Sequence, residues 1–271
     1  MFIGLGIGVG MTPLIGGGAS ALDALLRPGS AMMEMLWPDP QYWFTDVAAT
    51  TRVTAEGQPI RCWLSTTGAR FVQATDVARA PLAVKFPNGA WGASFDGVND
   101  ALLSEAALDL SAIAQIAVFA GVRKLSDAAN GVLIEHSTNA TNITGFNIFA
   151  PVDGTPDTTY RWAVRTTGGV AVNIGTTDPI FAAPDTSVIA ATVDGAAQTA
   201  ALRVDQVSVG TSNVVPVGTF ASQTLHIGAR AGTSNLFNGL VGPLIVRGGA
   251  LPVLDTIQQA EAIINAHIGA Y

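Results

Sequence analysis

From Trp91 onward, short apolar segments alternate with turn-forming residues at regular spacing, and this pattern constrains the fold more than any other feature. The predicted strands are Ala93–Phe95, Ala101–Leu103, Ala114–Val122, Gly131–His136, Gly145–Ala150, Tyr160–Thr166, Val170–Ile174, Thr186–Val193, Thr199–Val204, Gln206–Val209, Thr224–Ile227 and Leu240–Val246. Turn signals such as Asp194-Gly195 and Gly248-Gly249 separate them. Many short strands with evenly spaced turns indicate a β-sandwich or jelly roll. No repeat of about 20–50 residues is present, which disfavours a solenoid or propeller.

The segment Ser94-Phe95-Asp96-Gly97-Val98-Asn99-Asp100 predicts a sharp turn between two of these strands. Glycine adopts positive φ freely, and aspartate hydrogen-bonds to its own backbone. The segment resembles the start of a laminin-G-like (concanavalin-A-like) jelly-roll domain. Later stretches resemble the same family in order, namely Ile116–Val122, Ser187–Gly195, Leu225–Arg230 and Phe237–Val246. The resemblance implies an all-β, concanavalin-A-like jelly-roll β-sandwich. Pro243, inside the last of these stretches, should lie at a sheet edge or a bulge.

The C-terminal segment changes from strand to helical periodicity. Leu254, Ile257, Ala260, Ile264 and Ile268 recur at helical spacing. Asp255 is the predicted N-cap, with Gln258 three residues later, and Gly269 is the predicted C-terminal cap. We therefore expect a helix over 255–268 that packs on the sandwich. With this helix included, the predicted jelly-roll domain spans 91–271.

Residues 41–90 form a β-rich segment before the jelly roll, in which Tyr42–Phe44, Val53-Thr54, Ile60–Leu64 and Phe71-Val72 read as short strands. This segment resembles a recurrent lead-in of phage virion proteins. The matching residues are Trp43, Phe44, Asp46, Thr50-Thr51, Val53-Thr54, Gly57–Ile60, Trp63, Gly68, Gln73–Thr75 and Arg79-Ala-Pro81. The resemblance implies an origin in tailed-phage or phage-like (gene-transfer-agent-like) particles.

Residues 1–40 are interpreted as an N-terminal attachment and oligomerisation segment. Ile3, Leu5, Ile7 and Val9 alternate with Gly4, Gly6, Gly8 and Gly10, which predicts an assembly strand with one apolar and one bare face. A signal peptide fits less well because the first basic residue is Arg27. A transmembrane helix fits less well because glycines and Pro13 disfavour helix. A membrane-active segment or a disordered leader remain alternatives.

The stretch 19–38 is less decided, since its pattern does not choose between strand and helix. Its methionines, Met32, Met33 and Met35, are predicted to fill gaps in the core rather than to bind a ligand.

Charge is scarce: 12% of residues are charged, 49% are hydrophobic, and the mean hydropathy is +0.40. Such a surface indicates either a membrane protein or a subunit buried in an assembly. Beyond Leu26 the apolar runs are too short for a membrane span.

The net charge of −7 and the scattered 13 Lys and Arg exclude a nucleic-acid-binding surface. Cys62 is the single cysteine, so an intrachain disulfide is excluded.

The residues of common catalytic sites are not grouped in this sequence. The five glutamates, Glu34, Glu56, Glu105, Glu135 and Glu261, are far apart, and the Glu-x-Asp-x-Glu motif of related glycanases is absent. Pairing of carboxylates across strands, for example with Glu135, stays open. His136 should point to the opposite sheet face from Glu135, and the histidines have no metal-binding spacing. We therefore expect a protein that is not an enzyme.

Two groups of residues are candidates for ligand binding. Asp96, Asn99 and Asp100 offer oxygen ligands for calcium, although turn chemistry explains the same residues. No other cofactor is expected. Tyr160 and Trp162 lie on one face of a strand and form a candidate sugar-binding platform, although that face is equally explained as core.

These observations predict a non-enzymatic structural protein located in the virion: a capsid decoration, a fibre or a tail-associated adhesin. It would form a homo-oligomer, contact other virion proteins, and present its jelly roll for attachment to host-surface polysaccharide. The alternative is a secreted or surface lectin-like carbohydrate-binding module. A third hypothesis is a polysaccharide-degrading enzyme.

Overall fold

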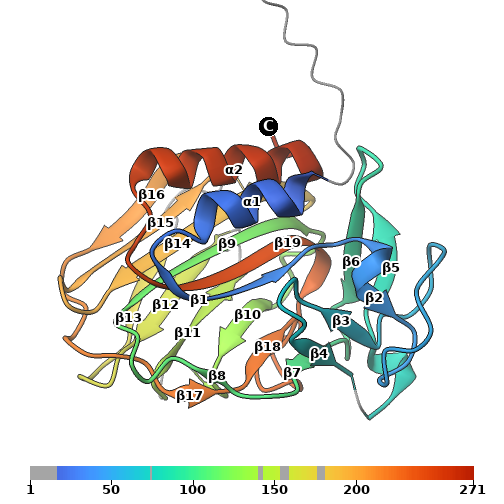
Figure 1. Ribbon diagram of the computed structural model, residues 1–271, viewed down its shortest axis with the longest axis horizontal. Coiled ribbons are helices and arrows are strands. Elements are labelled where there is room, and N and C mark those ends of the chain that lie inside the picture. The colour runs from blue at the N-terminus through green and yellow to red at the C-terminus, as the bar shows by residue number, and fades with distance from the viewer. Residues whose placement is uncertain (1–16, 74, 140–142, 153–158, 176–180) are drawn as a thin grey trace, which may run out of the picture.

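The computed structural model describes residues 17–73, 75–139, 143–152, 159–175 and 181–271. Two large antiparallel sheets stack face to face, and two helices cover the outer face of one of them (Figure 1). The chain therefore folds as a jelly-roll β-sandwich with a C-terminal helix, as predicted.

The first sheet has eight strands and carries the helices. In spatial order its strands are β16 (Val207–Ser212), β15 (Thr199–Val204), β14 (Asp185–Asp194), β9 (Gln115–Lys124), β19 (Asn238–Gly249), β6 (Trp91–Asp96) and β5 (Leu82–Lys85), and β1 (Ser30–Leu36) also pairs with β19.

The second sheet has nine strands. In spatial order they are β13 (Val172–Gly175), β12 (Arg161–Arg165), β11 (Gly145–Phe149), β10 (Val132–His136), β18 (Leu225–Ile227), β7 (Leu102–Ser104), β4 (Arg70–Val72), β3 (Cys62–Leu64) and β2 (Trp43–Phe44). A small sheet of β8 (Leu108–Asp109) and β17 (Ser222–Gln223) lies beside it, and short 3-10 helices span Pro40–Tyr42 and Val77–Arg79.

The main hydrophobic core fills the space between the two sheets. Apolar side chains from nearly every strand are buried there, including Phe71, Phe95, Phe146 and Trp162. Trp43 and Trp63 are cross-strand partners whose rings meet edge to face, with centroids 5.5 Å apart. Such aromatic pairs add stabilisation beyond the area that they bury.

Strand β19 changes neighbours halfway along its length. Its first residues pair with β6 and its last residues pair with β1, while β9 lies along its other edge. The register with β9 shifts between Val241 and Leu244. Pro243 lies inside this irregularity, where its missing N–H interrupts no regular ladder. The prediction of a bulge at Pro243 is confirmed.

Residues 19–38, which the sequence left undecided, contain both a helix and a strand. Helix α1 spans Gly18–Leu26, and strand β1 follows after Pro28 and Gly29. Met33 and Met35 are 4% and 1% exposed and pack with the helices, which confirms their role as core residues. Met32 is half-buried against the main core.

The second helix, α2, spans Leu254–Ile268 and packs with α1 on the eight-stranded sheet (Figure 1). Gly269 ends it in the left-handed conformation, as predicted, and its N–H donates to the carbonyl of Asn265 at 2.7 Å. The prediction of Asp255 as N-cap is wrong. Val253 is the extended residue before the helix, and Asp255 lies inside the first turn. Neither α1 nor α2, the α-helices of the described chain, is long and apolar enough to cross a membrane.

The described parts of the three predicted segments share the same two sheets. Strand β1 comes from 1–40, strands β2 to β5 come from 41–90, and all of them pair with one another or with strands of 91–271. The predicted assembly strand, with Ile3, Leu5, Ile7 and Val9, lies outside the described residues. The division of the chain into functional segments stays a prediction.

Candidate functional site

The predicted sugar-binding platform lies in the core. Tyr160 and Trp162 are both 0% exposed. The Tyr160 hydroxyl donates to Asp185 Oδ2 at 2.6 Å, and the Trp162 ring packs against Phe146 with centroids 5.3 Å apart. The face of β12 that carries Trp162 points between the sheets, so no sugar reaches either ring. The assignment of these two residues as a glycan platform is wrong, and the alternative that this face is core is confirmed.

The predicted calcium ligands form a local turn. Asp96 Oδ1 accepts hydrogen bonds from the N–H groups of Val98 and Asn99, at 2.7 and 3.1 Å. Asp100 Oδ2 accepts from the N–H of Asp96 at 2.9 Å, and burial raises the pKa of Asp100 to about 6. Among the described residues, no group of three or more His, Cys, Asp or Glu is placed to hold a metal ion. The hydrogen bonds therefore confirm the turn chemistry, while calcium binding stays a prediction without geometric support.

Glu135, the carboxylate considered for pairing across strands, is completely buried on the outer side of the nine-stranded sheet. Its Oε2 lies 3.3 Å from Arg230 Nε, and its Oε1 accepts from Asn147 Nδ2 at 3.1 Å. His136 points to the opposite face, as predicted, where its ring stacks on Phe146. The interactions of Glu135 with Arg230 and Asn147 are those of a buried ion pair.

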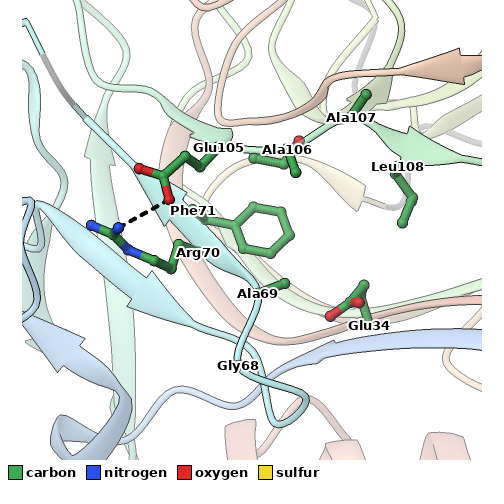
Figure 2. Close-up of a pocket in the computed structure, with 10 residues that line it drawn as sticks. Glu34, Gly68, Ala69, Arg70, Phe71, Glu105, Ala106, Ala107 and Leu108 are labelled. Atoms are coloured by element: carbon green, nitrogen blue, oxygen red, sulfur yellow. Dashed lines mark ion pairs between the residues drawn. The ribbon is translucent and has the colours of Figure 1, made fainter.

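A pocket of about 350 Å³ opens between the two sheets on one side of the sandwich. Its lining comes from β1, from β4 and the turn before it, and from the stretch that runs from the end of β7 to the start of β8. The residues are Glu34, Gly68, Ala69, Arg70, Phe71, Ser104, Glu105, Ala106, Ala107 and Leu108. Figure 2 shows the Arg70–Glu105 pair on one side, Glu34 on the other, and the Phe71 ring between them. Each of the three predicted segments contributes to this lining.

The apolar part of the pocket is fixed by the sheet. Phe71 follows Trp43 and Trp63 in a cross-strand row on the inner face and is 1% exposed. Ala106 and Ala107, in contrast, are exposed at the mouth. The buried Phe71 ring thus supports the wall from behind, and the apolar surface that a ligand can reach is that of Ala106, Ala107 and Leu108.

Arg70 and Glu105 form an ion pair at the rim, with Nη1 and Oε2 3.0 Å apart. The strands bring them together, because the N–H of Glu105 donates to the carbonyl of Arg70 at 2.8 Å. Arg70 Nη2 also donates to the carbonyl of Val47. The side chains are 32% and 49% exposed, so this pair contributes little to stability and is accessible to a ligand.

A chain of hydrogen bonds holds Glu34 on the opposite wall. Thr67 Oγ1 donates to Glu34 Oε2 at 2.6 Å. The Ser65 hydroxyl lies 2.8 Å from Thr67 Oγ1 and accepts from the N–H of Ala69 at 3.0 Å. A hydroxyl has one proton to donate, and Thr67 donates its proton to Glu34. The Ser65 hydroxyl is therefore the donor in its hydrogen bond with Thr67. Gly68, with φ of +91°, allows the tight turn that carries this chain.

The pocket combines an apolar wall with charged groups that are held in place. This composition, and a volume within the range of about 300–1,000 Å³ usual for ligand pockets, suits a compact ligand with one apolar face and several hydrogen-bonding groups. Sequence reasoning missed Glu34, Arg70 and Glu105 as a group. The three residues are far apart in the sequence, so no local pattern shows that they line one pocket. The pairing of β1 with β19 and of β4 with β7 brings them together.

No protein-family model matches this sequence, and no curated protein sequence matches it significantly. Similarity is found among solved structures. The binding domain of botulinum neurotoxin DC in complex with rat synaptotagmin II has a TM-score of 0.56 and 9% identity, and the match covers 88% of this chain and 52% of that one. The same binding domain in complex with SialylT gives 0.53 and 10% identity, covering 74% and 48%.

A third similar structure is domain 4 of AbnA, a GH43 extracellular arabinanase from Geobacillus stearothermophilus, in complex with arabinotriose. Its TM-score is 0.50 at 15% identity, with coverage of 67% of this chain and 81% of that domain. The present chain spans about half the length of the toxin chains. At these identities the likeness concerns the fold alone.

Proposed function

We propose that this protein is a non-enzymatic structural protein of a tailed-phage or phage-like virion, whose jelly roll binds a surface glycan in the pocket between Glu34 and Arg70. The observation that carries the glycan part is the composition of that pocket. A wall of alanines and Leu108 faces hydrogen-bonding groups that the ion pair and the Thr67 hydroxyl hold in position.

A saccharide matches these groups chemically. One face of a sugar ring presents C–H groups, which suit the accessible side chains of Ala106, Ala107 and Leu108. Its hydroxyls donate to carboxylate oxygens and accept from guanidinium N–H groups. The groups are positioned before the ligand arrives, which reduces the entropy cost of binding.

Two of the similar folds support the proposal. A toxin binding domain was solved in complex with SialylT, and the arabinanase domain in complex with arabinotriose. Because the identities are low, the pocket of this chain is the main support for saccharide binding.

We expect Ala107→Trp to block saccharide binding. Ala107 is exposed and lines the pocket, so an indole there fills the space without disturbing the core. Binding to the best oligosaccharide found on a glycan array should weaken at least about tenfold, or about 1.4 kcal/mol. Isothermal titration calorimetry on wild type and variant measures the effect.

The matched control is Ala129→Trp, which adds the same side chain at an exposed alanine that does not line the pocket. It should bind as the wild type does. Equal affinity of all three proteins would place the glycan elsewhere, and an array without any binding would refute the glycan part of the proposal.

The virion part rests on different features. Only 12% of the residues are charged, which suits a subunit with buried outer faces, and the 41–90 segment resembles phage lead-ins. Antibody labelling of purified particles, with mass spectrometry of their proteins, should find the chain in several copies per particle. Recovery of the chain only as a free, secreted monomer would refute the virion role and favour a lectin-like module.

A degrading enzyme is the second candidate, because Glu34 and Glu105 line the same pocket and paired carboxylates perform glycoside hydrolysis. Against it, Glu105 is paired with Arg70. Purified protein incubated with the polysaccharide that it binds should release no reducing ends. Release that is lost in both Glu34→Gln and Glu105→Gln would make the enzyme the better interpretation.

A further inference from the structure

The charges that line the pocket do not balance. Two carboxylates, Glu34 and Glu105, face one guanidinium, Arg70. Arg70 and Glu105 neutralise each other across 3.0 Å. Glu34 is therefore the group whose charge is not compensated within the lining.

One basic group outside the lining, Arg27 at the end of α1, interacts electrostatically with Glu34. Arg27 is hydrogen-bonded to Asp23, which chiefly raises the pKa of Arg27, and Glu34 adds a smaller contribution. Arg27 is thus already engaged by another carboxylate. The net charge of the whole chain, −7, adds to the negative potential at the pocket.

The geometry of Glu34 leaves one oxygen for a ligand. Thr67 holds Oε2 at 2.6 Å, and Oε1 accepts no hydrogen bond from the described residues. The Ser65–Thr67 chain fixes the carboxylate, so an incoming cation meets a preoriented acceptor. Figure 2 shows this carboxylate across the pocket from the Arg70–Glu105 pair.

We propose that the pocket selects an amino sugar, whose ammonium group binds Glu34 Oε1 while the rest of the ring lies against Ala106, Ala107 and Leu108. Neutral sugars bind more weakly, and sugars that carry a carboxylate are rejected by Glu34. This inference deepens the proposed function and rests on the pocket being a saccharide site. Glu34 acts as the specificity-determining residue, because it is the lining charge without a counterion in the lining.

The test compares two trisaccharides that differ at one group per ring. Chitosan trisaccharide carries an ammonium group where cellotriose carries a hydroxyl, and a glucuronate oligosaccharide supplies the acidic probe. At a pH below the pKa of the sugar amine, wild type should bind chitosan trisaccharide at least about tenfold more tightly than cellotriose, or about 1.4 kcal/mol. The glucuronate probe should bind more weakly than cellotriose. Rising salt should reduce the preference, because it screens a half-exposed charge.

Glu34→Gln should bring the ratio of the two affinities close to one. The control, Glu56→Gln, removes the same charge at an exposed position outside the pocket and should keep the wild-type ratio. Glu34→Asp, which retains the charge, should retain part of the preference. If Glu34→Gln fails to fold, as its melting curve would reveal, the salt dependence of the wild type and the Glu34→Asp variant still decide.

The possible outcomes distinguish the amino-sugar selectivity from saccharide binding itself. Absence of binding to any saccharide overturns the proposed function. Binding of cellotriose as tight as that of chitosan trisaccharide overturns only the amino-sugar selectivity. A preference that persists in Glu34→Gln, or that Glu56→Gln removes, overturns the role of Glu34.

Discussion

Arg203→Ala should lower the free energy of unfolding at neutral pH by about 3–5 kcal/mol, as expected when a buried ion pair loses one partner. Arg203 of β15 meets Glu261 of α2 through two contacts, Nε to Oε1 at 3.0 Å and Nη2 to Oε2 at 3.1 Å. The Glu261 side chain is 0% exposed. Without Arg203 its carboxylate would be buried without a counterion. Urea denaturation followed by circular dichroism measures the loss.

The loss should depend on pH with a defined sign. Burial raises the pKa of Glu261 even though Arg203 opposes the shift. The native state therefore holds a proton on Glu261 up to a higher pH than the unfolded chain does, and stability falls as pH rises from the unfolded pKa toward the folded one. Removing Arg203 raises the pKa of Glu261 in the folded state further. In acid Glu261 is protonated with or without Arg203, so the loss of unfolding free energy in Arg203→Ala should become smaller there.

Two comparisons test this explanation. Arg27→Ala breaks the exposed Asp23–Arg27 pair, whose side chains are 34% and 49% exposed, and should cost less than about 1 kcal/mol. The double replacement of Arg203 by Met and Glu261 by Leu should recover most of the loss, since an apolar pair substitutes well for a buried ion pair. Equal losses for Arg203→Ala and Arg27→Ala would contradict the buried-charge argument.

Trp162→Ala should also cost about 3–5 kcal/mol, the usual loss for removing a large aromatic side chain from a core. Trp162 is 0% exposed and lies opposite Ile148 and Ile174 on its neighbouring strands. Thermal melting and urea denaturation measure this effect. Saccharide binding by the fraction that remains folded should equal that of the wild type.

Trp162→Phe is the matched variant. The indole Nε1 is buried without a hydrogen-bond partner among the described residues, so phenylalanine removes an unsatisfied donor and keeps most of the ring. Its loss should be clearly smaller than that of alanine. A folded Trp162→Ala protein with abolished saccharide binding would revive the platform that the sequence predicted.

The strands of the jelly roll could be predicted because alternation and turn residues are local signals. Every strand predicted after Trp91 overlaps an observed one, and Thr199–Val204 matches β15 at both ends. The two-residue strands β8 and β17 were missed, since two residues carry no periodicity. Val53-Thr54 was wrongly predicted as a strand: only Arg52 forms a bridge there, and Val53 is buried in the core.

The β1 strand was harder to recognise because it is apolar on both faces. Met33 and Met35 face the helices while Leu36 faces the main core. Such a strand does not alternate, and a short apolar run fits strand and helix equally. Burial of Tyr160 and Trp162 was undecidable for a related reason: spacing tells which side chains share a face, and the partner sheet decides whether that face is covered.

The position of β1 beside β19 has a consequence for folding. Ser30 pairs with Gly249 and Leu36 with Leu244. Strand β1 is synthesised early but cannot pair until β19, the last strand of the sandwich, has been synthesised. Contacts between residues so far apart in sequence form slowly, because the intervening chain must first lose conformational entropy. Glu34 therefore reaches its place only after the polypeptide is nearly complete. A ribosome-bound fragment that ends before β19 would lack the Glu34 wall of the pocket, so a complete pocket would mark finished synthesis.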